Sequence, residues 1–315
     1  MRIAILGATS QIAKDLIISF SSEKDIYFFL FARRPGDVIN WLDSVDMADR
    51  FLVAEYSEFG QHKYEAIVNF VGVGNPAKTM SMGDEIFNVT LRFDDLALDY
   101  LKENPTCRYL FLSSGAAYGP VFNEPVSCET PATIAINNLQ PNEWYGVAKL
   151  YAECRHRALA ELPIIDIRVF NYFSRSQDLS ARFLMSDILR AICDKRILQT
   201  SPEYIVRDFL HPSDFHRLVS ALLAAPKTNA VVDCYSRAPV DRPTLLTAMQ
   251  ENFGLQYETV AASAAMNATG SKPYYYSLNR HAADFGYQPV FTSLEGVLEE
   301  SAAILQLRTM GSGDQ

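Results

Sequence analysis

Short apolar runs without polar alternation, separated by helix-like segments, fill the first half of this 315-residue chain. A strand that is apolar on both faces needs cover on both sides, which is the environment of a parallel sheet between helices. The repeated strand–helix order therefore predicts an α/β fold built on a doubly wound parallel sheet. The runs that we assign to strands are 2–6, 26–32, 51–54, 66–73, 109–112 and 164–170, and helical patterns cover 14–20, 84–101 and 144–162.

The pattern becomes less regular after residue 170. Helices are predicted over 182–195 and 215–225, and strands over 204–211 and 230–235. Thr292 and Glu295 have the spacing of a capping box ahead of a helix that runs to about Leu307. We expect a larger domain over residues 1–170 and a smaller one over 171–315, with segments near 205–236 returning to the main sheet. The small, polar stretch 261–272 is expected to be an exposed loop, and the tail 311–315 to fray.

Composition excludes several classes of function. The net charge is -9 and no basic run is longer than a pair, which argues against nucleic acid as a partner. The five cysteines are dispersed and form no CxxC pair, so we expect neither a disulfide framework nor a metal site. No apolar stretch is long enough to span a bilayer, and because Met1-Arg2 leads straight into a strand-like run we expect no signal peptide. We therefore expect a cytoplasmic protein without a membrane partner.

The turn after the first predicted strand is a candidate dinucleotide site. Residues 7–13 fit a GxxGxxG frame in which only Gly7 keeps its glycine, while Ser10 and Ala13 are small replacements. Backbone N–H groups at such a helix start can bind a pyrophosphate. The alternative is a plain strand-to-helix turn. The candidate cofactor contacts here are Gly7, Thr9, Ser10, Gln11 and Ile12.

Two further patterns carry possible chemistry. Tyr145 and Lys149 lie four residues apart on a predicted helix, so the ammonium can approach the phenol and lower its pKa towards neutrality. Ser114 follows the strand 109–112, where its hydroxyl would face the crevice at the carboxyl end of the sheet. The alternatives are an exposed Tyr–Lys pair on a helix surface and ordinary turn chemistry for the serine.

Taken together and in this order, these features resemble the extended short-chain dehydrogenase/reductase family. Four segments strengthen the resemblance: SSGAAYG at 113–119, YGVAKLYAE at 145–153, RVFNYF at 168–173 and RDFLHPSDF at 207–215. The resemblance extends from Arg2 to Val297. It implies a Rossmann-type dinucleotide-binding domain, followed by a smaller C-terminal substrate-binding domain for a nucleotide-sugar.

The resemblance also implies roles for individual residues. Tyr145 would exchange a proton with the sugar oxygen, Lys149 would hold the ribose hydroxyls and depress the Tyr145 pKa, and Ser114 would bond the reacting oxygen. Asn171 and Arg207 match positions that hold the nucleotide-sugar, with Arg207 on the diphosphate. The segment running beneath the cofactor would include Asn69, Phe70 and Gly72.

Two departures from the family pattern shape the expected function. Arg33 and Arg34 stand where NAD-preferring members end the second strand with an acidic residue, so we expect NADP(H) rather than NAD(H). A solvated arginine pair is the alternative. Gly115 and Ala116 occupy positions where family dehydratases carry an acidic pair, which disfavours dehydration.

The sequence therefore predicts an NADP(H)-dependent reductase of a 4-keto (6-deoxy) nucleotide-hexose. One alternative is a nucleotide-sugar C4 epimerase that retains NAD(P); another is a non-catalytic dinucleotide sensor on the same fold. In the resembled family, helices equivalent to 84–101 and 144–162 often form a four-helix interface between subunits, so we expect a homodimer.

Overall fold

The computed structural model describes residues 1–47, 50–72, 76–260 and 272–311. Its centre is a seven-stranded sheet with the strand order β11-β6-β5-β4-β1-β2-β3, and every neighbouring pair is parallel. The prediction of a doubly wound parallel sheet is confirmed. The strands are β1 (Arg2–Leu6), β2 (Tyr27–Phe31), β3 (Leu52–Ala54), β4 (Ala66–Asn69), β5 (Arg108–Ser114), β6 (Ile164–Val169) and β11 (Ala230–Asp233).

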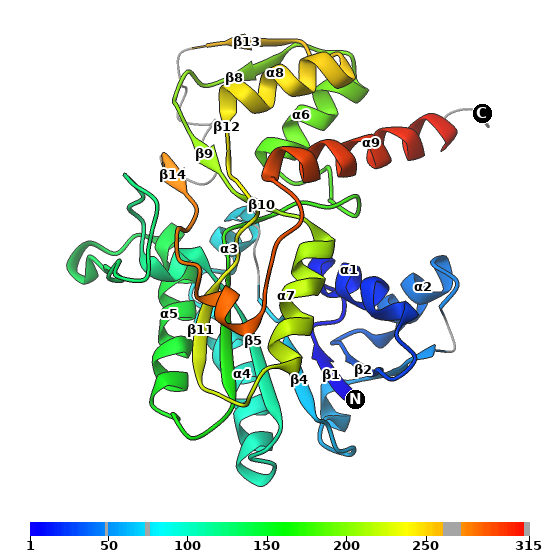
Figure 1. The fold of residues 1–315 in the computed structure, drawn as a ribbon, viewed down its shortest axis with the longest axis vertical. Helices are drawn as coiled ribbons and strands as arrows, with labels where there is room; N and C mark the ends of the chain where they lie inside the picture. Colours follow the sequence, from blue (N-terminus) through cyan, green and yellow to red (C-terminus); the bar gives the residue numbers. More distant parts are fainter. Residues whose placement is uncertain (48–49, 73–75, 261–271, 312–315) are drawn as a thin grey trace.

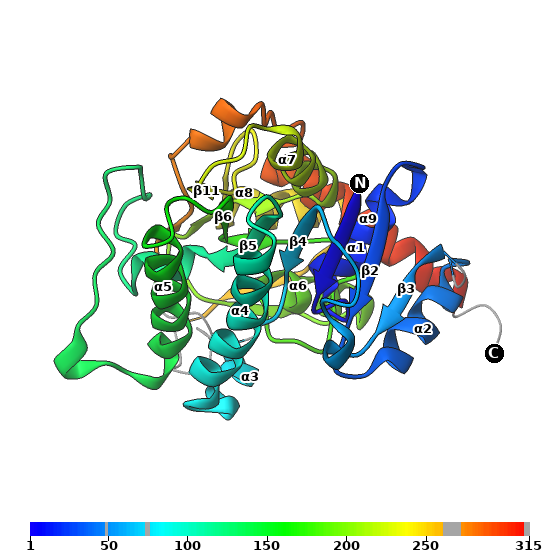
Figure 2. The same ribbon diagram turned by 90° about the horizontal axis from the view of Figure 1, so that it is seen from below.

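Helices cover both faces of the sheet, which explains why the strands lack polar alternation (Figure 2). Ile3 and Ile5 of β1 pack into the core under α1 (Gln11–Ser19), α2 (Pro35–Ser44) and α7 (Pro212–Ala224). Ala4 and Leu6 point to the other face, under α4 (Glu85–Glu103) and α5 (Trp144–Arg157). The short helix α3 (Pro76–Met82) precedes α4.

A smaller body lies beyond the carboxyl ends of the main strands, in the upper part of Figure 1. It has its own apolar core, built around α6 (Leu184–Cys193), α8 (Arg242–Phe253) and α9 (Ser293–Gly311). Three small sheets complete it: β7 (Asn171–Tyr172) with β10 (Phe209–Leu210), β9 (Val206–Arg207) between β12 (Val240–Asp241) and β14 (Tyr274–Tyr275), and β8 (Leu198–Thr200) with β13 (Tyr257–Thr259).

The strand predicted over 204–211 is broken in the structure at Asp208. The Asp208 carboxylate is buried and accepts hydrogen bonds from the Ser236 N–H and the Ser293 hydroxyl, so this residue leaves the strand to anchor two distant segments. The resulting strands β9 and β10 lie in the small sheets, whereas β11 joins the main sheet beside β6. Division of the chain at residue 170 stays a prediction.

The predicted capping box at the start of α9 is confirmed. The Thr292 N–H donates to the Glu295 carboxylate at 2.8 Å, and the Glu295 N–H donates to the Thr292 hydroxyl at 3.2 Å. The predicted loop 261–272, apart from Lys272, and the predicted frayed tail 311–315, apart from Gly311 at the end of α9, fall outside the described residues. Within the described ranges, no helix combines the length and the apolar character needed to cross a membrane.

Candidate active site

A cleft of about 1460 Å³ lies between the carboxyl edge of the main sheet and the smaller body, and residues of both parts line it. Its volume exceeds that of a typical small-ligand pocket and leaves room for a dinucleotide beside a second ligand. Asn69 and Arg34 are the two predicted contact residues that do not line it. The predicted residues that do are Gly7, Thr9, Ser10, Gln11, Ile12, Arg33, Phe70, Gly72, Ser114, Tyr145, Lys149, Asn171 and Arg207.

The turn between β1 and α1 has the geometry of an anion cradle. Gly7 has φ +83°, and a Cβ atom on it would lie 3.0 Å from the Val71 backbone nitrogen, so only glycine fits this close approach. Ser10 precedes α1 and makes no side-chain capping hydrogen bond, which leaves the first N–H groups of the helix for a ligand. The turn therefore fits a dinucleotide pyrophosphate.

Of the remaining predicted cofactor contacts, Arg33 faces the cleft, whereas Arg34 and Asn69 do not. Arg33 lines the cleft beside Tyr56, whereas Arg34 pairs with Asp37 at 2.8 Å. Asn69 is buried, and its side-chain oxygen accepts from the Val71 N–H at 2.9 Å. Asn69 thus lies behind the cleft wall and holds the segment of that wall that follows β4.

Ser114, Tyr145 and Lys149 converge on one point of the cleft. Lys149 Nζ lies 5.9 Å from the centre of the Tyr145 ring and donates to the Leu112 carbonyl at 2.7 Å. The Ser114 hydroxyl hydrogen-bonds Tyr145 and also lies 3.5 Å from the Tyr275 hydroxyl. Ser114 ends β5, whereas Tyr145 and Lys149 are on α5. The packing of α5 against β5 therefore brings the three predicted residues together.

The net shift of the Tyr145 pKa in the structure is upward, whereas the sequence pattern predicts a pKa lowered towards neutrality. Burial raises the pKa of Tyr145 above its usual value of 10, and the neighbouring Tyr275 raises it further, while the hydrogen bond from Ser114 opposes the change. Burial also lowers the pKa of Lys149 to about 8, with Asp94, Glu153 and Asp166 opposing that shift. Tyr145 is therefore a neutral phenol at physiological pH.

Three cations line the far side of the cleft without a carboxylate at ion-pair distance in the described part of the chain. Arg207 and Arg242 donate to backbone carbonyls, at 2.8 Å to Lys272 and at 2.8 Å to Ser201 respectively. Lys272 Nζ lies 4.7 Å from the centre of the Tyr275 ring. Burial lowers the pKa of Arg207 to about 10 and of Lys272 to about 8. Such desolvated positive charge favours an anionic ligand.

Sequence reasoning missed Arg242, Lys272 and Tyr275. Tyr275 reaches the site because β14 pairs with β9, the strand that carries Arg207. Arg242 begins α8, directly after β12, which pairs with the other edge of β9. Nothing in the local pattern of these segments indicates that pairing, although the run KPYYY at 272–276 is an unusual aromatic cluster.

Packing leaves no space for a side chain at position 115. A Cβ atom on Gly115 would lie 2.4 Å from the Phe170 ring. A Cβ atom on Gly146 would lie 2.5 Å from the Ala116 carbonyl oxygen, so α5 also packs closely on this segment. An acidic residue at position 115 would therefore require Phe170 to move.

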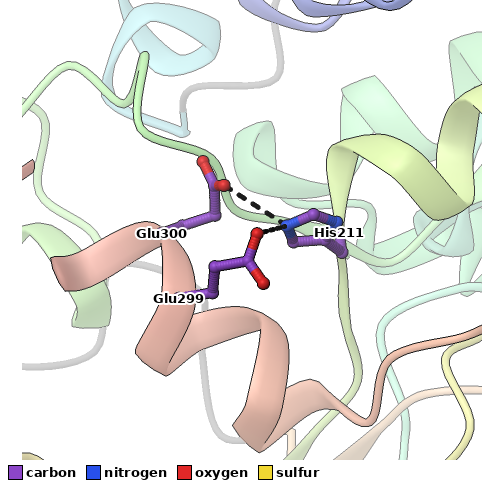
Figure 3. A group of neighbouring side chains, drawn as sticks. All are labelled: His211, Glu299 and Glu300. Carbon is purple, nitrogen blue, oxygen red and sulfur yellow. Dashed lines mark hydrogen bonds and ion pairs between the residues drawn. The ribbon is translucent and has the colours of Figure 1, made fainter. Parts of the chain in front are cut away.

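One cluster with possible metal ligands lies outside the cleft. His211 faces Glu299 and Glu300 on α9, with ligand atoms within 4.8 Å of one another (Figure 3). Arg175 binds Glu300 at 2.6 Å. Burial alone would raise the Glu300 pKa, but hydrogen bonds from His211 and Arg175 bring it to about 2. The carboxylate charge is already compensated, and the cluster ties α9 to the start of α7.

Comparison with known proteins places the fold. The comparison with curated protein sequences gives no match. UDP-glucose-4-epimerase from Stenotrophomonas maltophila, with bound NAD and formylated UDP-arabinopyranose, superposes with a TM-score of 0.80 at 16% identity over 99% of each chain. UDP-glucuronic acid 4-epimerase from Bacillus cereus, in complex with UDP-glucuronic acid and NAD, gives 0.79 at 16% identity over 98% of this chain and 100% of that one.

A dehydratase has the same fold. The dTDP-glucose 4,6-dehydratase from Bacillus anthracis in complex with NAD gives a TM-score of 0.78 at 16% identity, with 98% of each chain covered. At such identity these similarities show a shared fold. The model of the NAD dependent epimerase/dehydratase family matches residues 3–235, which is well over half of the chain. The chain therefore belongs to the NAD dependent epimerase/dehydratase family.

Proposed function

We propose that the protein is an NADP(H)-dependent reductase of a 4-keto (6-deoxy) nucleotide-hexose. The observation that carries the proposal is the placement of Ser114, Tyr145 and Lys149 in one cleft, between the turn at Gly7 and the buried cation Arg207. A dinucleotide on the turn and a diphosphate on the cations would meet at these three side chains.

The chain's own residues supply the proton chemistry. A bound nicotinamide would supply the hydride that reduces the sugar carbonyl. Tyr145 would give its phenolic proton to the resulting sugar oxygen, and Ser114 would hydrogen-bond the same oxygen. Because burial keeps Tyr145 protonated, it is in the form that reduction of a carbonyl needs first. Lys149 would stabilise the phenolate that forms.

The cation cluster supports a nucleotide-sugar as the substrate. Arg207, Arg242 and Lys272 provide the positive charge that a diphosphate requires. Asn171 lies between the two bodies, where its amide donates to the Asp208 and Tyr275 carbonyls at 3.4 and 3.3 Å. The structures of similar fold described above hold UDP-sugars in two cases.

Arg33 supports NADP(H) as the preferred cofactor, because its guanidinium lines the cleft at the end of β2. The similar structures described above were determined with NAD. This difference makes a C4 epimerase with a retained cofactor the second candidate. Dehydration is disfavoured because Phe170 leaves no space for an acidic side chain at position 115. A non-catalytic sensor would not need the three residues that the cleft brings together.

The proposal also includes a homodimer. The helices α4 and α5 pack side by side, and Phe87 and Leu91 on α4 lie near Tyr151 on α5. Tyr151 is 53% exposed on this face. The half-buried Phe87 and Leu91 on α4, together with the exposed Tyr151 on α5, suit a four-helix contact with a second copy. A cytoplasmic location stays a prediction.

The test uses purified protein with NADPH or NADH and a panel of 4-keto nucleotide-sugars, following absorbance of the reduced cofactor. Stoichiometric consumption of NADPH, faster than of NADH, is expected. Interconversion of two nucleotide-sugars without net consumption would replace the reductase with the epimerase. Binding of a dinucleotide without turnover of any sugar would favour the sensor.

A further inference from the structure

Arg242 holds the loop over residues 201–205, which connects β8 to β9 at one end of the cleft. The Nη1 atom of Arg242 donates to the carbonyl oxygens of Ser201 and Glu203, at 2.8 and 2.9 Å. The backbone N–H of Arg242 donates to the Ile205 carbonyl at 2.9 Å. One residue therefore binds alternate carbonyls along the whole 201–205 loop, and the three residues that it binds all line the cleft.

The position of Arg242 is itself fixed by its neighbours in the chain. It is the first residue of α8, where the Asp241 carboxylate accepts from the Thr244 N–H at 2.8 Å and Pro243 lies in the first turn. The strand β12 ends at Asp241 and pairs with β9, so that Asp241 lies opposite Val206. The capped helix start and the strand pairing together keep the Arg242 backbone beside the loop.

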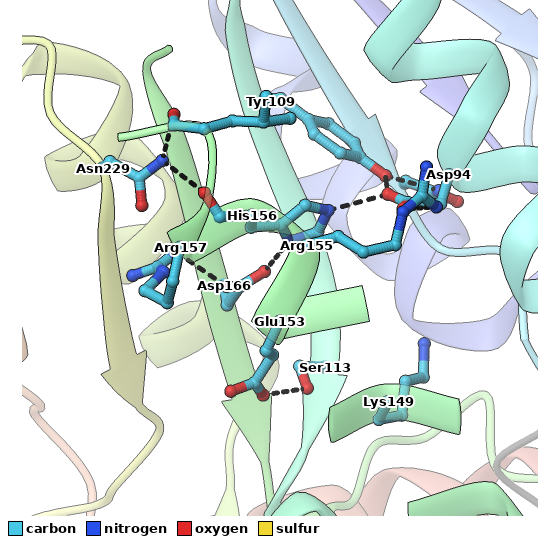
Figure 4. A network of polar contacts seen from close by, with 12 residues as sticks. Asp94, Tyr109, Ser113, Lys149, Glu153, Arg155, His156, Arg157, Asp166 and Asn229 are labelled. Atoms are coloured by element: carbon cyan, nitrogen blue, oxygen red, sulfur yellow. Dashed lines mark hydrogen bonds and ion pairs between the residues drawn. The ribbon is translucent and has the colours of Figure 1, made fainter. Parts of the chain in front are cut away.

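Arg242 has no acidic partner, unlike the buried histidine behind the cleft. His156 lies between Asp94 and Asp166, at 2.8 and 2.6 Å, in the layer between α4, α5 and the sheet (Figure 4). Burial alone would lower the His156 pKa, but hydrogen bonds to Asp166 and Asp94 raise it to about 9. Arg242 is only 9% exposed, and among the described residues no carboxylate lies at ion-pair distance from it. Its desolvated charge is spent on backbone carbonyls, which argues that the shape of the loop matters.

The 201–205 loop lies on the side of Arg207 that faces away from Ser114. After Arg207 the chain enters β10, which pairs with β7, the strand that directly follows β6 of the main sheet. Before Arg207 the chain forms the loop, and β8 ahead of it lies near the top of the smaller body (Figure 1). A nucleotide-sugar with its diphosphate at Arg207 and its sugar at Ser114 would therefore place its base against the loop.

The loop is a firm wall. The Ser201 hydroxyl accepts from the Glu203 N–H at 3.2 Å, and the Val260 N–H donates to the Thr200 carbonyl at 2.9 Å. Ser201 and Ile205 are both buried although they line the cleft. Bases differ in the placement of their hydrogen-bonding groups, so a site tells them apart only when its own groups are held in fixed positions.

We propose that Arg242 is a positioning residue for recognition of the nucleobase: it holds the 201–205 loop as the wall that the base of the substrate contacts, and discrimination between bases depends on it. This role rests on the proposed function, because a nucleoside diphosphate is the ligand assigned to Arg207. It is distinct from the charge of Arg242, which any cation in the cleft could supply to a diphosphate.

The test measures dissociation constants of UDP, dTDP, CDP, GDP and inorganic pyrophosphate for the full-length protein by isothermal titration calorimetry. Wild type should bind its best nucleoside diphosphate at least about tenfold more tightly than its worst. Arg242→Lys keeps the positive charge, but its shorter side chain should lose at least one of the two carbonyls. The base preference should then fall below about threefold, while pyrophosphate binding stays within about threefold of wild type.

Two controls separate the shape of the loop from the charge of the cleft. Lys272→Met removes a cation that lines the cleft, so it should weaken every ligand by a similar factor and leave the base preference intact. Arg237→Lys alters an arginine that donates to the Val290 carbonyl at 3.1 Å and does not line the cleft. All dissociation constants should be unchanged in that variant.

Ser201→Ala decides the matter if Arg242→Lys does not fold. It removes the hydroxyl that accepts from the Glu203 N–H, so it should reduce the base preference without changing pyrophosphate binding.

The proposal is overturned if Arg242→Lys or Ser201→Ala keeps the wild-type preference, or if wild type binds all four nucleoside diphosphates equally. A loss by one common factor for every ligand in Arg242→Lys, pyrophosphate included, would instead make Arg242 a phosphate ligand and also overturn it. If the preference depends on Arg242 while the wild-type protein reduces no keto-sugar, the assignment of Arg242 stands and the proposed reductase fails.

Discussion

The hydroxyl of Tyr275 lies 3.5 Å from Ser114 Oγ, although 161 residues separate the two in the chain. Tyr275 is carried by β14 and its ring packs edge-on against Phe122, at 4.7 Å between ring centres. The smaller body therefore contributes a hydroxyl to the point where the main sheet presents Ser114. The site is complete only when both parts of the chain are folded together.

Replacing Tyr275 with phenylalanine should lower kcat/KM for the keto-sugar about tenfold, because one hydrogen bond to Ser114 or to the sugar is lost. The dissociation constant of NADPH should stay unchanged, since Tyr275 is on the side of the cleft away from the turn at Gly7. Tyr274→Phe is the control, because that ring contacts Tyr204 and does not line the cleft. Equal losses in the two variants would contradict the role of Tyr275.

Arg33→Ala should weaken NADPH binding by at least about tenfold and leave NADH binding unchanged, because a guanidinium facing the cleft can bind the 2′-phosphate. Arg34→Ala should change either constant by less than about threefold, since Arg34 is engaged by Asp37 and solvent. Fluorescence titration with both dinucleotides measures the four constants. A larger effect from Arg34 would show that the arginine roles are reversed.

Gly115→Ala should destabilise the protein by about 1 to 3 kcal/mol, because the new methyl group overlaps the Phe170 ring. Gly36→Ala, where nothing lies within 4 Å of the added atom, is the control and should be close to neutral. Denaturant unfolding measures both. Phe170→Leu in the Gly115→Ala background should recover part of the lost unfolding free energy. If none is recovered, the destabilisation does not come from overlap with the Phe170 ring.

His156 should make stability decrease as pH rises above 6.5. Its pKa is 6.5 when unfolded and is raised to about 9 in the fold, so its contribution is complete below pH 6.5 and disappears through pH 9. Between pH 6.5 and 8 the loss should be about 1 to 2 kcal/mol. Lys149, with its pKa lowered to about 8, contributes the opposite slope from pH 8 to 10.5, so the measurement stops at pH 8.

Unfolding free energies at several pH values check this slope. His156→Asn should remove it and His62→Asn, at an exposed position, should not. An unchanged slope in His156→Asn would mean that other groups release the protons.

The sequence was informative where function depends on local geometry. The Gly7 motif lies within a single turn, and the Tyr145–Lys149 pair lies within a single helix. Spacing along the sequence alone therefore predicts which of these side chains share a face. Ser114 was predictable because parallel strands present their carboxyl ends at one edge.

The site residues that the sequence did not predict depend on contacts between distant segments of the chain. Tyr275 and Arg242 reach the cleft through strands of two residues that pair with β9, and such short strands have no recognisable period. The Tyr145 pKa was mispredicted for a similar reason, because the burial that raises it comes from the assembled cleft.

The most direct test of Tyr145 as the proton donor compares wild type with Tyr145→Phe in NADPH oxidation driven by a 4-keto nucleotide-sugar. Turnover should fall by about 10²–10⁴-fold, as expected for loss of a general acid, while the dissociation constant of NADPH should stay within about twofold. Ser114 and Lys149 remain in place in this variant, so the cleft should keep its shape. Turnover by Tyr145→Phe at the wild-type rate would contradict the assignment of Tyr145 as the proton donor.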